Sequence, residues 1–566
     1  MISFRGVMRV LLVVSKFGYP EKAPRPELFP QGVAYVAGAL KAAGHEVFGC
    51  NISYALTKTS AFELLRQSLA RGIAECQPQA IALGGLSADY LFIAHTIDLC
   101  RQLAPQVPLI LGGGIVTGDR NFITEHLRPD FSITGDAEFP MVELLAALRN
   151  GFDPNGIPGL AHWRDGAPVY NAPPAETRVM PEYARPDYDA LGIEDFFLAS
   201  SHRHASSLSA LHPRPRAFPV TAGRSCPFKC TFCFHSAGSV YKQRPIADVL
   251  DEIAYFHERY HFNLLMVYDE LFSVTEGRVR QFCDGMRALN LGVAWSCAMR
   301  VPDADEDLMR DMRDAGCRMI GFGVESGSDV VLTSMRKKIT QAQVRAALAA
   351  ADRAGIGFQA NVIYGDPAET AETIRETSDF CGEFAGRVIY PGIIVPFPGA
   401  PIFDDAVRRG LIPDRARYYE GLHGAPVYNL TALPDSEFRS LVGDAMMAHI
   451  SHLRFGAIAP VVFLVVGRGT SRDQFPRTTL VLRVTCPHCG ALLDRILDFG
   501  GDIRDVMNGD DTQLAAFIGQ GIEIPCPDCY KLLALRMDLA ATELVPVVTG
   551  GELLSYPRLL ANHKKE

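Results

Sequence analysis

Two long stretches of this 566-residue chain alternate between strand-like and helix-like segments, and this alternation limits the folds open to it. In residues 8–148, short apolar runs such as RVLLVVS (9–15) precede segments such as AFELLRQSLARGIAEC (61–76), whose apolar residues recur at helical spacing. Alternating strands and helices form a parallel sheet with helices on both faces. We therefore predict a doubly wound, flavodoxin-like α/β domain over residues 1–150.

Glycine-rich turns follow two of the strands expected in this domain. They close the runs AIALGG (80–85) and LILGGG (109–114). Ligands of such sheets bind at the carboxyl ends of the strands, where glycine lets backbone approach closely. We expect the turn residues to line a ligand site; they are Gly84, Gly85, Gly112, Gly113 and Gly114.

The second alternating stretch, residues 216–410, contains six βα units in succession and predicts a partial (β/α)6 barrel. In parallel barrels the loops after the strands carry the chemistry. Residues 151–215 are rich in proline and short of helical periodicity, apart from a possible hairpin in GLAHWRDGAPVYN (159–171). We interpret them as a linker packed between the two domains.

Composition excludes several classes of function. The chain carries a net charge of −9 with pI near 6.0, which gives no basic field for nucleic acid. Its longest apolar runs, MRVLLVV (8–14) and AIAPVVFLVV (457–466), are too short to span a membrane. The start has no cleavage-site pattern and runs directly into a strand-like segment. We expect a soluble, cytoplasmic protein without a transmembrane segment.

Three cysteines are crowded into AGRSCPFKCTFCFHSAG (222–238), directly after the first strand of the expected barrel. They are Cys226, Cys230 and Cys233, in a C-x3-C-x2-C spacing. A structural zinc site takes four protein ligands, and His235 lies too near in sequence to be an assured fourth. A four-iron cluster held by three thiolates would instead leave one iron open. The residues alone allow a defective zinc site or a reactive cluster.

With Phe232 before the last cysteine, this pattern resembles the radical S-adenosylmethionine (SAM) superfamily. The resemblance implies a [4Fe-4S] cluster on Cys226, Cys230 and Cys233, whose open iron binds SAM. It also implies reductive cleavage of SAM to a 5′-deoxyadenosyl radical. The segments VYDELF (267–272), GFGVESGS (321–328) and VIYGDPAET (362–370) resemble strand ends that line the SAM pocket in that superfamily.

The same resemblance supplies candidate SAM-pocket residues. Glu325 and Ser326 would face the amino-acid and ribose parts of SAM, and Arg300 would pair with its carboxylate. Each could equally be an ordinary polar residue at a strand end, and Glu369 could simply sit at a helix start, near its dipole. The full set of candidates is Phe232, Asp269, Glu270, Arg300, Glu325, Ser326, Gly365 and Glu369.

Over residues 8–410 the chain resembles the cobalamin-dependent branch of the superfamily. The resemblance rests on FPQGVAYVAGALKAAGHEV (29–47), LILGGG (109–114) and ITGDAEFPMVELL (133–145), the last departing from the branch's commoner G-E-G-E. It implies cobalamin in the N-terminal domain. Because no D-x-H-x-x-G occurs there, we expect no histidine below the cobalt, and His45 fits a turn better.

Two other interpretations of this domain stay open. It could be a flavodoxin-like domain without a cofactor, because fold alone does not establish a ligand. It could also belong to the methylthiotransferase branch, which brings three further cluster cysteines. Cys50, Cys76 and Cys100 match that branch only in number, and we interpret the isolated cysteines as small core residues.

Two C-P-x-C turns lie near the C-terminus, in CPHCG (486–490) and CPDCY (526–530). Their thiols, Cys486, Cys489, Cys526 and Cys529, match a four-thiolate zinc site, with an auxiliary iron–sulfur cluster as the alternative. We therefore expect a small zinc-ribbon-like module at 481–540. It lies between a mixed extension at 411–480 and a tail at 541–566.

The expected function is that of a cobalamin-dependent radical SAM methyltransferase. It would methylate an unactivated carbon of a small molecule, lipid or tetrapyrrole and draw electrons from a flavodoxin or ferredoxin. An alternative is a radical rearrangement without methylation, of the kind anaerobic porphyrin-ester cyclases perform. A third is a non-catalytic metal-binding interaction protein.

Overall fold

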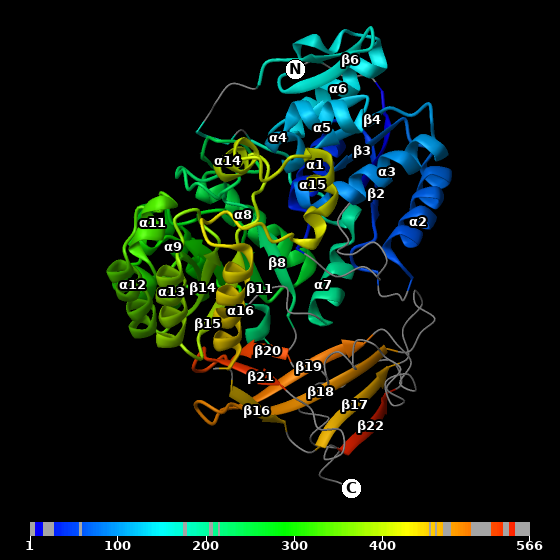
Figure 1. Ribbon diagram of the computed structural model, residues 1–566. Helices are drawn as coiled ribbons and strands as arrows, with labels where there is room; N and C mark the ends of the chain where they lie inside the picture. Colours follow the sequence, from blue (N-terminus) through cyan, green and yellow to red (C-terminus); the bar gives the residue numbers. More distant parts are fainter. Residues whose placement is uncertain are drawn as a thin grey trace.

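The computed structural model describes most of the chain as an N-terminal α/β domain, a barrel beside it and a β-sheet below both (Figure 1). Described are residues 6–14, 28–55, 59–173, 178–180, 182–202, 208–212, 215–451, 454–458, 461–467, 477–499, 522–535 and 543–549. Within these ranges, no helix combines the length and apolar character needed to cross a membrane.

The N-terminal sheet has the order β2-β1-β3-β4-β5-β6-β7, and its first five strands are parallel. This order confirms the expected flavodoxin-like winding, whose ligand crevice opens where the strand order reverses, beside β1 and β3. The parallel strands are β1 (Arg9–Val14), β2 (Glu46–Asn51), β3 (Ala80–Gly84), β4 (Leu109–Gly112) and β5 (Phe131–Ile133). The helices are α1 (Gln31–Ala42), α2 (Ala61–Cys76), α3 (Tyr90–Leu103), α4 (Gly114–Gly118), α5 (Arg120–Leu127) and α6 (Glu138–Asn150).

The region expected to be a linker contributes to both neighbours. Strands β6 (Leu160–Arg164) and β7 (Ala167–Tyr170) form the expected hairpin, but it extends the N-terminal sheet. A helix that the sequence did not predict follows, α7 (Ile193–His202). Its Phe196 and Phe197 are buried in an aromatic core with Phe29 and Tyr260. Tertiary packing, not periodicity, therefore stabilises this short helix.

The barrel is a six-stranded parallel sheet in sequential order, β8-β11-β12-β13-β14-β15, and β8 and β15 are its edges. This confirms the partial (β/α)6 barrel. Its strands are β8 (Ala217–Val220), β11 (Leu264–Val267), β12 (Ala294–Met299), β13 (Cys317–Glu325), β14 (Gly357–Tyr364) and β15 (Val388–Ile393). Its helices are α8 (Ile246–Tyr260), α9 (Glu276–Leu289), α10 (Glu306–Asp314), α11 (Asp329–Ser334), α12 (Gln341–Ala354) and α13 (Ala371–Glu383).

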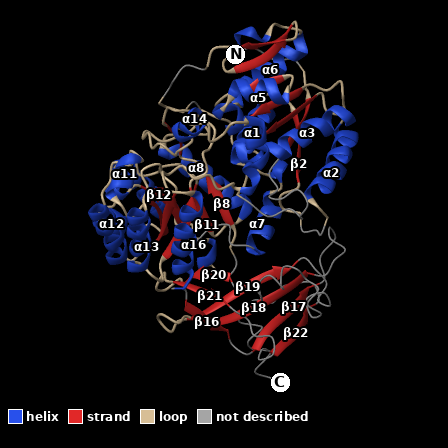
Figure 2. Cartoon of the chain, viewed as in Figure 1, coloured by secondary structure: helices blue, strands red, loops and turns tan. Residues whose placement is uncertain are grey.

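After the barrel, three helices lead into a further sheet, coloured gold to red in Figure 1. The helices are α14 (Pro401–Arg408), α15 (Arg415–Gly421) and α16 (Asp435–Ser451). The strands are β16 (Arg454–Ile458), β17 (Val461–Gly467), β18 (Arg477–Thr485), β19 (Leu492–Phe499), β20 (Ile522–Pro525), β21 (Leu532–Leu535) and β22 (Glu543–Thr549). Figure 2 shows that strands dominate this part. The sheet extends beyond the 481–540 module on both sides, and residues 550–566 of the expected tail lie outside the described ranges.

The seven isolated cysteines lie in hydrophobic cores, as the sequence predicted. All seven are buried: Cys50, Cys76, Cys100, Cys283, Cys297, Cys317 and Cys381. Three of them, Cys50, Cys76 and Cys100, belong to one core cluster of the N-terminal domain. Burial raises the pKa of Cys50 to about 11 and that of Cys100 to about 12, so both stay thiols and pack as small apolar residues.

Candidate functional site

The three central cysteines lie on a loop at the carboxyl end of β8, where parallel barrels place their chemistry. A short antiparallel pair, β9 (Gly223–Arg224) and β10 (Lys242–Gln243), closes the base of this loop. The Thr231 N–H donates to the carbonyl of Met335 over 3.0 Å, and the Ile402 N–H donates to the Thr231 carbonyl over 2.9 Å. The loop is thus fixed to the barrel and to the start of α14.

The three central thiols share one kind of environment. Each of the three is half-buried, and burial raises their pKa values, that of Cys233 to about 12. Among the described residues, only the four C-terminal cysteines gather within 4.8 Å of one another. Cys226, Cys230 and Cys233 are not part of such a group.

Two positive side chains lie beside the loop. The Arg300 guanidinium stacks 3.5 Å from the centre of the Phe228 ring and donates to the Lys337 carbonyl over 2.9 Å. The Lys337 ammonium pairs with Glu325 at 2.6 Å and lies 5.9 Å from the Phe232 ring. Burial raises the pKa of Cys230, and these two cations oppose that shift. Together they favour anionic ligands at the loop.

Arg300 and Glu325 were expected from the sequence to lie at this site, whereas Lys337 and Phe228 were not. Lys337 belongs to a basic triplet, Arg336-Lys337-Lys338, in the loop after α11. Nothing local in that triplet shows which of its members turns toward the cysteines. Phe228 lies inside the cysteine spacing itself, where an aromatic residue offers a surface for a neighbouring cation.

Other expected SAM-pocket residues hold turns in the structure. The Ser326 hydroxyl is fully buried, 3.0 Å from the Thr377 hydroxyl and 3.1 Å from the Ser328 N–H that donates to it. Glu369 accepts the Gly365 N–H over 2.6 Å. Ser326, Gly365 and Glu369 thus stabilise turns that follow strands β13 and β14. Their contact with SAM stays a prediction.

The two acidic residues after β11 point in different directions. Asp269 is buried and accepts the Ala222 N–H over 2.7 Å, which anchors the start of the cysteine loop. Burial raises the pKa of Asp269 to about 7. Glu270 is more exposed, lies 2.7 Å from the His235 ring and lines a cavity between the domains. Asp269 therefore stabilises the start of the cysteine loop, whereas Glu270 lines the cavity.

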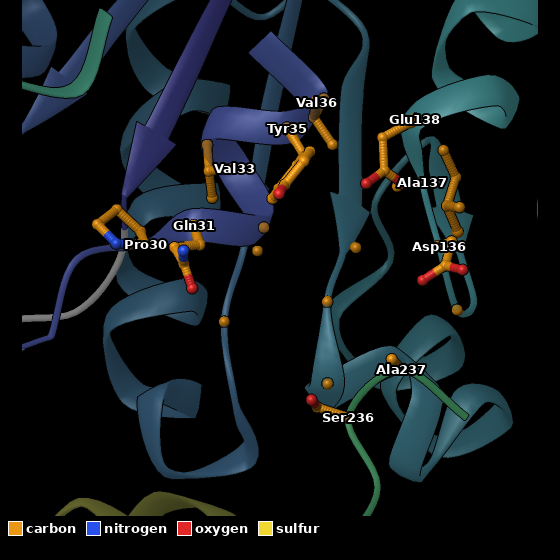
Figure 3. Close-up of a pocket in the computed structure, with 18 of the residues that line it drawn as sticks. Pro30, Gln31, Val33, Tyr35, Val36, Asp136, Ala137, Glu138, Ser236 and Ala237 are labelled. Carbon is orange, nitrogen blue, oxygen red and sulfur yellow. The ribbon is translucent and has the colours of Figure 1, made fainter. Parts of the chain in front are cut away.

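That cavity, of about 400 Å³, lies between the N-terminal domain and the cysteine loop. All five glycines of the expected ligand turns line it, from Gly84 to Gly114. Gly113 has a φ of +85°, and a Cβ there would come 2.9 Å from the backbone of Gly85. Figure 3 shows α1 on one side, residues 136–138 opposite, and Ser236 and Ala237 of the barrel loop below. Both domains thus build one cavity.

A buried ion-pair network joins the two walls. Arg224, two residues before Cys226, pairs with Asp136 at 2.7 Å and with Glu138 at 2.5 Å. Lys242 pairs with Asp136 at 2.6 Å. Burial by itself would raise the pKa of Asp136, but both cations hold it below its usual value. The remaining oxygen of Glu138, Oε2, is buried without a partner in the described part of the chain, which fits a cavity built for a ligand.

Each of the two domains that line the cavity matches a known family. The model of the radical SAM superfamily matches residues 220–381, and that of the B12 binding domain matches residues 24–145. The chain therefore contains a radical SAM domain and a B12-binding domain. This confirms the resemblance drawn from the sequence and identifies SAM, a [4Fe-4S] cluster and cobalamin as its cofactors.

Curated relatives fall into more than one reaction class. An uncharacterized methyltransferase of Pyrococcus horikoshii is 24% identical over 392 residues, covering 68% of this chain and 79% of that protein. The anaerobic magnesium-protoporphyrin IX monomethyl ester cyclase of Rubrivivax gelatinosus is 25% identical over 386 residues, covering 66% of each. The names of these relatives thus include a methyltransferase and a ring-closing enzyme.

Solved structures share the fold. The radical SAM methyltransferase TsrM of Kitasatospora setae, with cobalamin and a [4Fe-4S] cluster bound, matches with a TM-score of 0.58 and 18% identity. The match covers 71% of this chain and 78% of that one. The cobalamin-dependent radical enzyme OxsB matches with a TM-score of 0.54 and 16% identity, covering 75% of this chain and 58% of OxsB. At these identities the likeness is one of fold.

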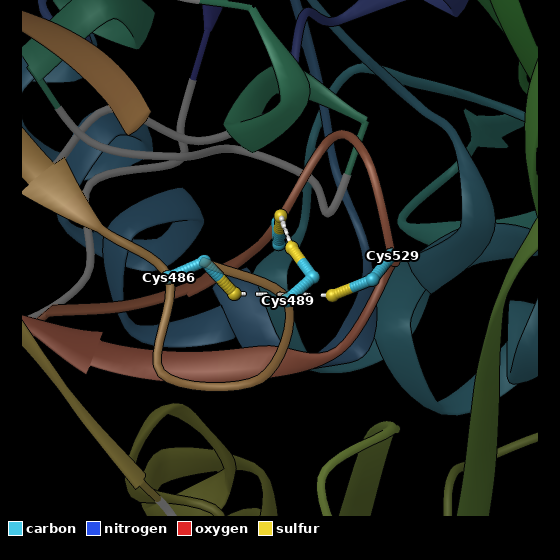
Figure 4. Close-up of side chains that lie close together, drawn as sticks. Cys486, Cys489 and Cys529 are labelled. Atoms are coloured by element: carbon cyan, nitrogen blue, oxygen red, sulfur yellow. Dashed lines mark hydrogen bonds between the residues drawn. The ribbon is translucent and has the colours of Figure 1, made fainter. Parts of the chain in front are cut away.

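The four C-terminal cysteines gather as the sequence predicted. Figure 4 shows their sulfurs meeting between two turns. Cys486 and Cys489 lie on the β18–β19 turn, and Cys526 and Cys529 on the β20–β21 turn. All four thiols lie within 4.8 Å of one another, as a closed site for one ion requires.

Proposed function

We propose that the protein is a cobalamin-dependent radical SAM methyltransferase that methylates an unactivated carbon. The observation that carries the proposal is the shared cavity. Its upper wall is the glycine-lined crevice of the B12-binding domain, and its lower wall contains Ser236, Ala237 and Glu270 of the cysteine-loop region. A substrate held between these walls would face both cofactors, and such positioning is a large part of catalysis.

The residues present fit the cofactors that the two domains imply. Cys226, Cys230 and Cys233 would hold the cluster, Arg300 and Lys337 would attract the carboxylate of SAM, and the glycine turns would receive the corrin. Bound there, the cluster supplies the electron that cleaves SAM to a 5′-deoxyadenosyl radical, and cobalamin supplies the methyl group. The chain's own task is to orient these groups and to keep water and other quenchers out.

The cavity wall suits an apolar or largely uncharged substrate. Leu12, Val33, Val36, Ile110 and Met141 line it on the N-terminal side. Charged groups near the cavity are mostly engaged with one another, as in the pairs of Arg224. We therefore favour a lipid, a tetrapyrrole or another small ring system as substrate, and a flavodoxin or ferredoxin as electron donor.

The test is anaerobic reconstitution with iron, sulfide and cobalamin, followed by incubation with SAM and a chemical reductant. We expect both 5′-deoxyadenosine and S-adenosylhomocysteine, the second only when cobalamin is present. Cys226→Ala should lose 5′-deoxyadenosine, whereas Cys76→Ala, which alters a buried core cysteine, should keep it. S-adenosylhomocysteine that forms equally well without cobalamin would contradict the proposal.

A second candidate is oxidative ring closure, which the similarity to the Rubrivivax cyclase favours. The same cofactors would then act without net methyl transfer. Formation of 5′-deoxyadenosine without S-adenosylhomocysteine, and a product lighter by two hydrogens, would identify that reaction. A non-catalytic metal-binding role would be identified by the absence of SAM cleavage in the reconstituted protein.

A further inference from the structure

The two C-terminal cysteine turns repeat one backbone pattern. In the first, the Cys486 N–H donates to the Ala491 carbonyl over 2.8 Å and the Gly490 N–H donates to the Cys486 carbonyl over 3.0 Å. In the second, the Cys526 N–H donates to the Lys531 carbonyl over 3.0 Å and the Tyr530 N–H to the Cys526 carbonyl over 2.8 Å. Two equivalent turns present two thiols each to a common centre.

The distances between sulfurs indicate a single ion rather than a cluster. Cys486 and Cys529 are 3.8 Å apart, and Cys489 and Cys526 are 3.7 Å apart (Figure 4). A tetrahedron with Zn–S bonds of about 2.3 Å has sulfurs about 3.8 Å apart. A four-iron cluster binds each thiolate to a separate iron and requires wider spacing. The four thiols are therefore arranged for one ion.

One residue breaks the symmetry of the two turns. The position after the second cysteine has a left-handed backbone in both, with a φ of +77° at Gly490 and +55° at Tyr530. Glycine adopts this conformation readily, whereas tyrosine does so at an energetic cost. The Tyr530 ring packs against the barrel core, and a Cβ on Gly357 would come 2.5 Å from it. This contact explains a tyrosine where the first turn has glycine.

Hydrogen bonds tie the same turn to the barrel. The Leu532 N–H donates to the Gly386 carbonyl over 2.6 Å, and Arg387 donates to the Cys529 carbonyl over 3.1 Å. Arg387 also pairs with Asp352 at 2.7 Å. Gly357 and Arg387 lie at the amino-terminal ends of β14 and β15, at the opposite end of the barrel from the cysteine loop. The contacts are thus remote from the radical chemistry.

We propose that Cys486, Cys489, Cys526 and Cys529 form a mononuclear zinc site that shapes the β20–β21 turn for docking. The docked turn fastens the C-terminal sheet to the amino-terminal end of the barrel. All four ligand positions are filled by thiolates, so the ion has no open position for catalysis. Tyr530 is the anchor of the docked surface.

The metal is tested by elemental analysis of the full-length chain carrying Cys226→Ala, Cys230→Ala and Cys233→Ala, so that the central loop binds no iron. One zinc per chain is expected. Adding Cys489→Ser and Cys529→Ser should remove it. Iron at these positions, with or without sulfide, or the absence of bound metal, would overturn the site.

Docking is tested by hydrogen exchange at the Leu532 amide in the zinc-loaded chain. Tyr530→Gly removes the ring but suits the left-handed backbone, so zinc should stay at one per chain while Leu532 exchanges at least tenfold faster. Tyr255→Ala, a change at an exposed tyrosine of α8, should leave that rate unchanged. Unchanged protection in Tyr530→Gly would overturn the anchoring role.

Discussion

Lys337 shows how one residue can control the charge beside the cysteine loop. Its ammonium is largely buried and pairs with Glu325, which is 8% exposed. Glu325 itself has a φ of +69°, a conformation rarely adopted by residues other than glycine. A strained, buried carboxylate at a strand end persists only where its surroundings hold it. Lys337 is the principal part of those surroundings.

Lys337→Met should therefore lower the free energy of unfolding by roughly 3–5 kcal/mol, because it leaves Glu325 buried without its partner. Lys338→Met, at an exposed neighbour, is the matched control and should change it by less than about 0.5 kcal/mol. Urea unfolding of the parent chain, Lys337→Met and Lys338→Met measures both changes in unfolding free energy. Equal stability of the two variants would show that the pair does not support the loop.

Glu369 makes the stability of the barrel depend on pH. Burial raises its pKa from 4.5 to about 8, so the folded chain keeps a proton there that the unfolded chain releases. The stabilisation is complete below about pH 4.5 and is lost as pH rises through about 8, with a slope of at most about 1.4 kcal/mol per pH unit. Glu369→Gln should flatten this decline.

Urea unfolding at pH 5.5 and pH 8 measures the effect. The loss of stability between these values should be smaller in Glu369→Gln than in the parent chain, whereas Glu372→Gln, at an exposed position, should behave like the parent. Asp366, the nearby acid, is present in all three proteins, and its charge contributes to the raised pKa of Glu369. An identical loss in all three would assign the pH dependence to other groups.

At the level of elements, the ion pairs of Arg224 join the cysteine loop to the residues that begin α6. Arg224→Met would leave Glu138, which is 2% exposed, without its cation. We expect a loss of roughly 3–5 kcal/mol in unfolding free energy and weaker cobalamin binding. Arg66→Met removes an exposed pair on α2 of the same domain and should leave the unfolding free energy nearly unchanged.

Thermal unfolding and equilibrium titration with cobalamin measure these two effects. If Arg224→Met binds cobalamin as tightly as Arg66→Met, the ion pairs hold the domains together without shaping the cavity. If it is also equally stable, the network contributes nothing measurable.

Elements with strong periodicity were predicted closely from the sequence. Helix α2 spans Ala61–Cys76, the same range that the pattern indicated. Helix α7 was missed because its stability comes from aromatic packing, and the short helices α4 and α5 fall in a segment without clear helical spacing. Local patterns therefore gave the barrel and the domain order, but not the elements that join them.

Residues of the candidate site were likewise predicted only where they form a local pattern in the sequence. Cys226, Cys230 and Cys233 form a local spacing, so their loop could be predicted. Lys337 reaches the loop from another turn, and Glu138 lies 86 residues from Arg224. Such partners meet only after the sheet and barrel have packed, and no sequence spacing indicates them.

Over the whole molecule, the chemistry and the docking contacts lie at opposite ends of the barrel. The carboxyl ends of the strands face the B12-binding domain, and the amino-terminal ends of β14 and β15 hold the C-terminal sheet (Figure 1). The cavity thus lies between two domains, while the β20–β21 turn packs against the far end of the barrel.

We propose that cobalamin binds in the cavity directly above the cluster loop. Electron paramagnetic resonance of the anaerobic, reconstituted chain, with cob(II)alamin and the reduced cluster both present, tests this placement. We predict magnetic coupling that broadens both signals and disappears in Cys226→Ala, which should still bind cobalamin. Two unperturbed signals, each identical to that of the singly loaded protein, would contradict the claim.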